Sequence, residues 1–370
     1  MTRKTSPLKA EDVQGKVRPR DVAALLLSVN LLYVPAARAE RPPDESWTFT
    51  FRFENDLFAD TDRFYTNGLK LNWVSPELQW FQDLPWFRNN TWLSRWGNRL
   101  VEALPYSADR ERQRNLSLSV GQMMFTPEDI ERRDLIVDDR PYAGWLYGSV
   151  AFHSKTYRRL DTFELQAGLT GPWSLAEQAQ DLVHELRGIK RAQGWDNQID
   201  TEPGLAAVYE YKYRIIPRHD FTGQWGVDAI VHAGAAAGTV YTYVNWGLEA
   251  RAGWNIPADF GTGLIRPAGE TDAPSDTRDP RYAADRREFS LHLFAAASGR
   301  LVARDIFLDG NTFSDSHDVE KETLVGDVVL GASMVWRSFK LSYAQVLRTG
   351  EFERQHGIQK FGSISLSYTY

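Results

Sequence analysis

Hard oxygen donors gather in one short segment that follows a run of alternating aromatic residues. Asn55 and Asp56 begin this segment, and Asp60 and Asp62 follow within a few positions. Carboxylate and amide oxygens are the ligands that Ca²⁺ prefers in proteins, so the segment could hold this ion. It lacks the glycine and the terminal glutamate of an EF-hand loop. Spacing alone favours an ordinary turn built from Asn, Asp and Gly.

A second polar segment combines arginines with a compact motif. Arg132 and Arg133 precede the sequence D-R-P-Y-A-G-W at residues 139–145. Guanidinium groups bind phosphate oxygens through forked hydrogen bonds, so the arginines could hold an anionic group. A solvated loop that leads into a strand explains the same residues, and the segment alone does not decide between the two.

A third segment predicts a helix with a candidate general base. Ser174 and Glu177 have the spacing of a capping box, so the helix is expected to begin there. Gln180 and His184 are four residues apart and therefore lie on one face, where a neutral histidine can take a proton from water. The sequence has neither the second histidine of a zincin motif nor a G-x-S-x-G nucleophile, and a histidine on a helix surface is the simpler reading. A separate apolar stripe on this helix consists of Leu175, Ala179, Leu182, Val183 and Leu186.

The elements that must position these segments alternate with a period of two. Trp47, Phe49, Phe51 and Phe53 are interleaved with polar residues, and the same pattern recurs to the end of the chain. A soluble β-sandwich also alternates. The alternating runs here are about ten residues long, which is the length that crosses a bilayer at a tilt. The pattern therefore favours a transmembrane β-barrel with polar residues facing inward.

The predicted fold is all-β, a 12-stranded antiparallel transmembrane β-barrel with a short helix in an extracellular loop. A hairpin at residues 297–299 would give thirteen strands, but bacterial single-chain barrels have even strand numbers. The predicted strands are 46–54, 67–75, 115–123, 144–154, 162–170, 204–216, 223–234, 243–254, 288–308, 325–336, 338–347 and 361–370.

Composition excludes several other classes of protein. Aromatic residues make up 13% of the 370 residues, which argues against a disordered chain. The chain has no cysteine, so a disulfide scaffold is excluded. The net charge of −6 does not suggest a nucleic-acid partner. A basic stretch, an apolar run and the sequence A-R-A at 37–39 predict a signal peptide at 1–39, followed by the barrel at 40–370.

The alternating direction of antiparallel strands places the connections. Segments 55–66, 124–143 and 171–203 are expected on the outer side of the membrane, and 76–114 and 255–287 on the periplasmic side. Trp and Phe residues at 80–96 suggest an interfacial helix in the first of these periplasmic segments. The second is polar and rich in proline and glycine, which predicts an irregular loop.

The motifs, in their order along the chain, resemble those of the outer-membrane lipid A 3′-O-deacylase family. They are E-N-D-L-F at 54–58, T-D-R-F-Y-T-N-G at 61–68, D-R-P-Y-A-G-W-L at 139–146, G-P at 171–172, Q-x-x-x-H at 180–184 and G-W-x-x-Q at 194–198. The resemblance implies a twelve-stranded barrel that removes the 3′-linked acyloxyacyl group of lipid A and needs Ca²⁺. The family lysine of the second outer loop falls near Arg132, and a family glutamate six residues past the histidine falls at Lys190.

The resemblance also assigns roles residue by residue. His184 is expected to activate water as general base, with Gln180 and Thr66 orienting groups or donating to the oxyanion. Asp56 and Asn55 are expected to hold Ca²⁺, with Asn55 counted among the catalytic residues as well. Arg132 is expected to contact a phosphate or sugar of the substrate. Polar residues from separate outer loops can converge at the rim, where an outer-leaflet ester is presented.

Two other functions remain open at the level of the sequence. One is an outer-membrane phospholipase, although no Ser-His-Asn grouping is found. The other is a passive pore or non-catalytic barrel, which bulky inward residues and about twelve strands disfavour. The expected partners are lipid A or lipopolysaccharide and outer-membrane lipid, the expected location is the bacterial outer membrane, and the expected oligomeric state is a monomer.

Overall fold

The computed structural model describes residues 45–56, 64–78, 112–269, 271–276, 278–282 and 289–370, together with isolated positions 92, 95 and 99. The predicted signal peptide lies outside the described residues, as does most of the predicted interfacial helix at 80–96, so both stay predictions. The strands are β1 Thr48–Asn55, β2 Phe64–Val74, β3 Gln113–Thr126, β4 Ala143–Lys155, β5 Arg159–Thr170, β6 Pro203–Thr222, β7 Trp225–Gly238, β8 Tyr241–Trp254, β9 Phe289–Asp305, β10 Leu324–Trp336, β11 Phe339–Arg348 and β12 Gln359–Thr369.

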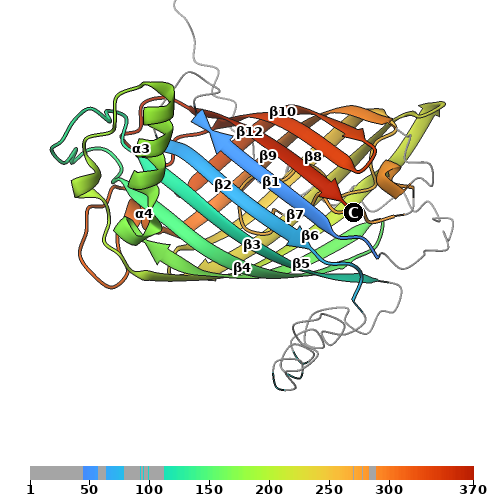
Figure 1. Cartoon of the computed structure of the whole chain (residues 1–370), viewed down its shortest axis with the longest axis horizontal. Coiled ribbons are helices and arrows are strands. Elements are labelled where there is room, and N and C mark those ends of the chain that lie inside the picture. The colour runs from blue at the N-terminus through green and yellow to red at the C-terminus, as the bar shows by residue number, and fades with distance from the viewer. Residues whose placement is uncertain are drawn as a thin grey trace, which may run out of the picture. The chain divides into compact units, whose positions relative to one another are not determined.

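These strands form one closed antiparallel barrel in which each strand pairs with its neighbours in sequence and β1 pairs with β12 (Figure 1). Thr48 pairs with Thr369 and Asn55 with Gly362, so the closing seam is in register along all of β1. The predicted twelve-stranded barrel is confirmed. The alternative hairpin at 297–299 is wrong, because β9 continues through those residues and pairs with β8 and β10.

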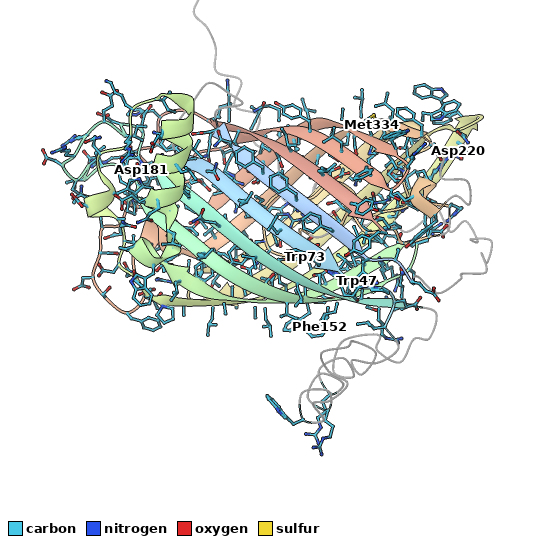
Figure 2. All side chains as sticks on the ribbon, in the orientation of Figure 1. Trp47, Trp73, Phe152, Asp181, Asp220 and Met334 are labelled. Carbon is cyan, nitrogen blue, oxygen red and sulfur yellow. The ribbon has the colours of Figure 1, made fainter. Side chains whose placement is uncertain are left out.

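The period of two in the sequence sorts side chains between the two faces of the wall. In β1, Thr48, Thr50 and Arg52 are buried in the lumen, and the intervening aromatic residues are half-exposed on the outer surface. Trp73 and Met334 project from that outer surface (Figure 2). An apolar outer face and a polar interior are what a bilayer requires of a closed barrel. No helix among the described residues has the length and apolar character to span a membrane.

The segment that joins β8 to β9 folds back into the lumen, where it forms a plug at residues 255–282. The Asp259 carboxylate lies 2.8 Å from Lys340 Nζ and 2.6 Å from an Arg251 guanidinium nitrogen. Asp272 pairs with Lys340 at 2.9 Å and with Arg52 at 2.6 Å. The prediction of an irregular loop on the periplasmic side missed this placement, because the partners of these carboxylates lie on distant strands.

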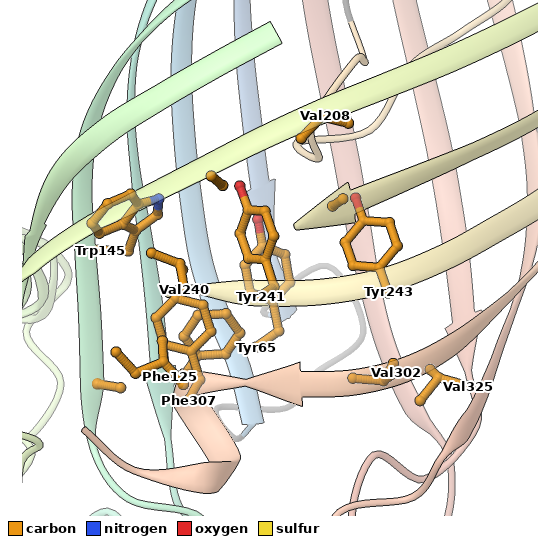
Figure 3. Close-up of a cluster of buried hydrophobic side chains, with 14 of the residues drawn as sticks. Tyr65, Phe125, Trp145, Val208, Val240, Tyr241, Tyr243, Val302, Phe307 and Val325 are labelled. Atoms are coloured by element: carbon orange, nitrogen blue, oxygen red, sulfur yellow. The ribbon is translucent and has the colours of Figure 1, made fainter. Parts of the chain in front are cut away.

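The other end of the lumen is closed by aromatic packing and a short helix, α4 (Ile306–Asp309). Phe307 of α4 stacks on Phe125 at a centroid distance of 4.3 Å, and Tyr65 and Tyr241 belong to the same buried cluster (Figure 3). A cavity of about 70 Å³ remains between this cluster and the plug. The lumen is therefore filled by the plug and, at its other end, by the aromatic cluster and α4.

Removal of the plug carboxylate at Asp259 is expected to destabilise the barrel. Asp259→Ala would leave Arg251, Arg281 and Lys340 buried without this partner, which typically costs about 3–5 kcal/mol. The free energy of unfolding in urea, followed by tryptophan fluorescence in detergent micelles, measures the effect. Asp220→Ala removes a half-exposed carboxylate paired with Arg218 and should change stability by less than about 1 kcal/mol. Equal stability of the two variants would contradict a structural plug.

Candidate active site

The site lies on the outer face of the wall, at the end of the barrel where β1 ends. Asn55 shares the outward face of Phe53, and its neighbours across the sheet are Asn67 on β2 and then Met124 on β3. Asn55 and Asp56 are nevertheless buried. Polar side chains on the lipid-facing side of a barrel need cover, and the fold supplies it.

A β-bulge turns Thr66 toward this outer face. Tyr65 pairs with Phe125 and Asn67 with Met124, so Thr66 is an extra residue in β2. Bulges commonly re-aim a side chain beside an active site. Thr66 Oγ1 lies 2.7 Å from Thr126 Oγ1, and both hydroxyls are buried. The bulge thus brings the predicted Thr66 onto the face that carries Asn55.

Helix α3 (Ala176–Arg187) covers part of this outer face, where it contacts β3 and β4. A 3₁₀ turn, η4 (Gly171–Ser174), precedes it. A side chain at Gly144 would collide with Ser174 Oγ and would come within 2.5 Å of the Ala176 Cβ. Only glycine at this position of the D-R-P-Y-A-G-W motif lets the helix lie so close to β4.

The predicted capping box is wrong, although the predicted helix is confirmed. Leu175 occupies the N-cap position in a left-handed conformation with φ 59°, and no side chain caps the helix. Ser174 Oγ instead donates a hydrogen bond of 2.6 Å to the Gly171 carbonyl oxygen. The hydroxyl therefore closes the preceding 3₁₀ turn rather than the first turn of α3.

The buried face of α3 carries the two residues predicted to share it, Gln180 and His184, together with Ala176. Trp195 Nε1 donates a hydrogen bond of 2.7 Å to Gln180 Oε1. Gln180 Nε2 is buried and has no hydrogen-bond partner among the described residues. Because its oxygen is held by the indole, the Gln180 amide keeps the N–H groups of Nε2 available as donors.

The turn that ends α3 orients His184. His184 Nδ1 lies 2.5 Å from the backbone carbonyl oxygen of Lys190. A carbonyl only accepts, so Nδ1 carries the proton and Nε2 is left with the lone pair that a general base needs. The Lys190 side chain is exposed and pairs with Glu131 at 2.9 Å. The lysine at this position therefore does not prevent orientation of the histidine, since the backbone performs it.

The direction of α3 carries His184 away from β4, where the helix begins. The helix lies across the end of the barrel, roughly perpendicular to the long axis of the barrel (Figure 1). His184 lies about 12 Å beyond Ala176 along the helix axis. This distance equals the spacing of about two to three strands. Ala176 packs at β4 and α3 also contacts β3, so the helix carries His184 away from β4 in the direction of β2 and β1, the strands of Thr66 and Asn55.

The second outer segment is built on Asp139 and packs against the turn after α3. The Asp139 carboxylate accepts hydrogen bonds of 2.7 Å from the backbone N–H groups of Glu128 and Arg140. Burial raises the pKa of this carboxyl above its ordinary value, against the opposing effect of the Arg140 N–H. The Gln193 N–H donates to the Ile130 carbonyl at 2.8 Å, which joins this segment to the one that holds Trp195.

Arg132 lies apart from the residues on the buried face of α3. Its side chain is exposed and lines an open groove of about 690 Å³ together with Phe64 and His356. The groove borders the start of β2, near the bulge at Thr66. The structure thus puts Arg132 at the rim beside the site and not within it.

The donor chemistry at the end of β1 fits a hard divalent cation. Asp56 supplies a fully buried carboxylate and Asn55 an amide oxygen. The described residues contain no group of three or more His, Cys, Asp or Glu side chains that could hold a metal ion. Asp60 and Asp62 fall at 57–63, outside the described residues. The sequence analysis missed Thr126 and the Lys190 carbonyl. It singled out Trp195 only as the tryptophan of the G-W-x-x-Q motif, without a role.

This fold and this site define an outer-membrane β-barrel that shields polar residues between its lipid-facing wall and a rim helix. A family model described as outer membrane protein LpxR matches residues 23–370. The chain therefore belongs to the LpxR family, the lipid A 3′-O-deacylase family whose motifs it carries, and it is an outer membrane protein.

Among solved structures, LpxR from Salmonella typhimurium aligns with a TM-score of 0.66 and 16% identity, over 87% of this chain and 99% of that chain. At this identity the likeness shows the fold alone. The β domain of the Bordetella autotransporter BrkA aligns at a TM-score of 0.39 and 8% identity, over 88% of this chain and 99% of that chain. A sequence comparison with curated proteins finds no match.

Proposed function

We propose that the chain hydrolyses the 3′-linked acyloxyacyl ester of lipid A in the outer leaflet of the outer membrane. The observation that carries this proposal is His184, which is buried between α3 and the outer wall with Nδ1 held by the Lys190 carbonyl. A base fixed on the lipid-facing side of a barrel suits a substrate that itself lies in the membrane. Membership of the LpxR family supports the same substrate class.

The reaction assigned to this site is direct attack by water. Nε2 of His184 takes a proton as the water oxygen attacks the ester carbonyl carbon. The tetrahedral intermediate then collapses with cleavage of the bond to the sugar oxygen, and the protonated Nε2 returns its proton to that oxygen. The products are the free acyloxyacyl acid and a 3′-hydroxyl on the glucosamine. The proton that Nδ1 shares with the Lys190 carbonyl keeps the imidazole ring in place through both steps.

The negative charge of the intermediate needs stabilising donors. Gln180 Nε2 is buried and its amide is oriented by Trp195, so its N–H groups are suited to the oxyanion. Thr66, paired with Thr126, can orient the ester or the attacking water. Arg132 at the rim groove is suited to a phosphate or sugar of the substrate.

Asp56 and Asn55 are the residues that would hold Ca²⁺. When bound, the ion would polarise the ester carbonyl and stabilise developing negative charge, without a protein nucleophile. The donor chemistry supports this assignment, because carboxylate and amide oxygens are the ligands that Ca²⁺ prefers in proteins.

Competition between two lipids tests the proposed function. The purified barrel is given equal amounts of hexa-acylated lipid A and phosphatidylethanolamine in mixed micelles, and the products are identified by mass spectrometry. Release of a 3-acyloxyacyl acid from lipid A is expected, with the phospholipid left intact. Release of a simple fatty acid from the phospholipid would identify a phospholipase instead and would overturn the proposal.

A passive pore is disfavoured by the packed lumen. The plug at 255–282 and the cluster around Phe307 leave about 70 Å³ between them. Planar-bilayer recordings are expected to show no stable open level. A steady conductance from the intact barrel would favour the pore over the enzyme.

Trp195→Phe is expected to lower kcat by about tenfold or less. The reason is the loss of one hydrogen bond, which contributes a net free energy of about 0.5–1.5 kcal/mol. The phenyl ring keeps the packing on Tyr142 but cannot donate to Gln180 Oε1. Initial rates of deacylation measure the effect. Trp173→Phe changes an exposed tryptophan in the same connection and should alter the rate by less than about twofold. Equal rates for both variants would show that the indole does not orient Gln180.

A further inference from the structure

Helix α3 has three distinct faces, and the proposed chemistry uses only one of them. Its buried face holds Gln180 and His184 against the wall. At about 100° per residue, two further faces flank it on opposite sides. The acidic face consists of Glu177, Asp181 and Glu185, and the apolar face of Leu175, Ala179, Leu182 and Val183.

The apolar face is half-buried at Ala179 and Val183 and exposed at its two leucines. Leu182 is 59% exposed, and Leu175 is more than half exposed. Trp173 in the preceding turn is 68% exposed, and Ile189 after the helix is also exposed. A cluster of large apolar side chains on a surface helix marks a contact with a partner or a membrane.

The position of α3 indicates what covers this face. The helix lies on the lipid side of the wall, because it packs over Met124, which faces outward from β3. Its axis runs across the long axis of the barrel, and so parallel to the membrane plane (Figure 1). The wall beside it carries outward apolar residues such as Leu205 on β6 and Val120 on β3. The apolar face of α3 thus continues the lipid-facing surface of the barrel.

We propose that α3 is an interfacial helix whose apolar face, extended by Trp173 and Ile189, is seated among acyl chains of the outer leaflet. Its acidic face, which includes Asp181 (Figure 2), then points to the aqueous side. The occupant is the leaflet itself and not a second copy, because the apolar face is continuous with a wall that lipid already covers. Seating the helix holds the Nε2 atom of His184 at the depth where acyl esters meet the sugar head groups.

The absence of cysteine makes single-site spin labelling a direct test. Labels at Leu182 and Glu185 are compared in liposomes of lipopolysaccharide and phospholipid with references at Leu205 on the wall and Val137 in an exposed loop. The spin label at position 182 is expected to be accessible to oxygen dissolved in the bilayer and protected from a water-soluble nickel chelate, as is the reference label at position 205. The label at 185 is expected to meet the chelate, as at 137. Chelate access at 182 equal to that at 137 would overturn the proposal.

The same labels distinguish lipid from a second copy of the chain. Dipolar broadening at 182 that persists at low protein-to-lipid ratio would show that another copy covers the face and would contradict the proposal. Absence of broadening, with the label protected from the chelate, supports contact with acyl chains. These measurements need no catalysis, so they remain decisive even if the proposed deacylase activity fails.

A functional arm rests on the proposed function. Leu182→Asn is expected to lower deacylation of lipid A in bilayers by about tenfold, since one large apolar contact with lipid is lost. The rate on detergent-dispersed lipid A should stay within about twofold of wild type, because no residue of the site is changed. Glu185→Gln serves as the control on the aqueous face and should leave both rates unchanged. Equal losses in bilayers and detergent would assign Leu182 a structural role and contradict membrane seating.

Discussion

His184→Ala is expected to reduce the rate of lipid A deacylation by about 10²–10⁴-fold, the usual contribution of a positioned general base. The imidazole is buried on α3 and held through Nδ1 by the Lys190 carbonyl, so Nε2 is the basic nitrogen. No other described residue on the buried face of the helix can take a proton from water at neutral pH. Initial rates with purified lipid A, with folding confirmed by heat-modifiable gel mobility, measure the loss.

Lys190→Ala is the matched control for the histidine variant. It removes an exposed ammonium paired with Glu131 and leaves the backbone carbonyl that orients His184. The rate should therefore stay within about twofold of wild type. A folded His184→Ala variant with full activity would overturn the base assignment. Loss of activity in Lys190→Ala equal to that in His184→Ala would show that the side chain, and not the carbonyl, positions the base.

Asp56→Asn is expected to lower the rate by about 100-fold or more, because a bound cation contributes several kcal/mol to transition-state stabilisation. The substitution keeps the shape of the fully buried side chain and removes its charge. Chelation of wild-type enzyme should cause a comparable loss, and added Ca²⁺ should restore the rate in wild type but not in the variant. Both are read as initial rates in buffers of fixed free Ca²⁺.

Asp138→Asn supplies the control for the aspartate variant. Asp138 is an exposed rim carboxylate paired with Arg354, and its neutralisation should change the rate by less than about twofold. An active Asp56→Asn variant would remove Asp56 from the site. If Asp56→Asn is inactive but chelation leaves the wild-type rate unchanged, the carboxylate takes part in the mechanism and the metal role is excluded.

Most of the barrel could be predicted because membrane strands obey a simple rule. Alternation of Phe49, Phe51 and Phe53 with Thr50 and Arg52 reflects one face toward lipid and one toward a polar lumen. The alternating direction of antiparallel strands then gathers the first, third and fifth connections at one end. The predicted gathering of Asn55, Thr66 and His184 at one end of the barrel follows from this rule.

The packing of the lumen could not be predicted, because the residues that form ion pairs there are distant from one another in the sequence. Asp259 and Asp272 read as ordinary loop residues, and only the closed barrel shows that Lys340 lies between them. Burial of such carboxylates is stable only when cations surround them, and no local pattern announces those cations. For the same reason, the sequence predicts the irregular character of this segment but puts it on the periplasmic side instead of in the lumen.

Local backbone geometry accounts for the remaining differences. The left-handed Leu175 separates Ser174 from α3, and a capping-box spacing cannot reveal this conformation. The Lys190 carbonyl orients His184, although the type of side chain at 190 carries no trace of that contact. Thr126 was missed because its hydrogen bond with Thr66 depends on the bulge in β2. This bulge makes Thr66 an extra residue between Tyr65 and Asn67, and no sequence pattern shows it.

The mass spectrum of lipid A from cells is the most direct test of the account. A Gram-negative host with hexa-acylated lipid A and no such deacylase expresses either the wild-type chain or His184→Ala at equal outer-membrane levels. Wild type is expected to yield a tetra-acylated species that lacks the 3′-acyloxyacyl group, and the variant to leave lipid A unchanged. Unaltered lipid A with the folded wild-type barrel, or the same loss in both strains, would contradict a His184-dependent deacylase.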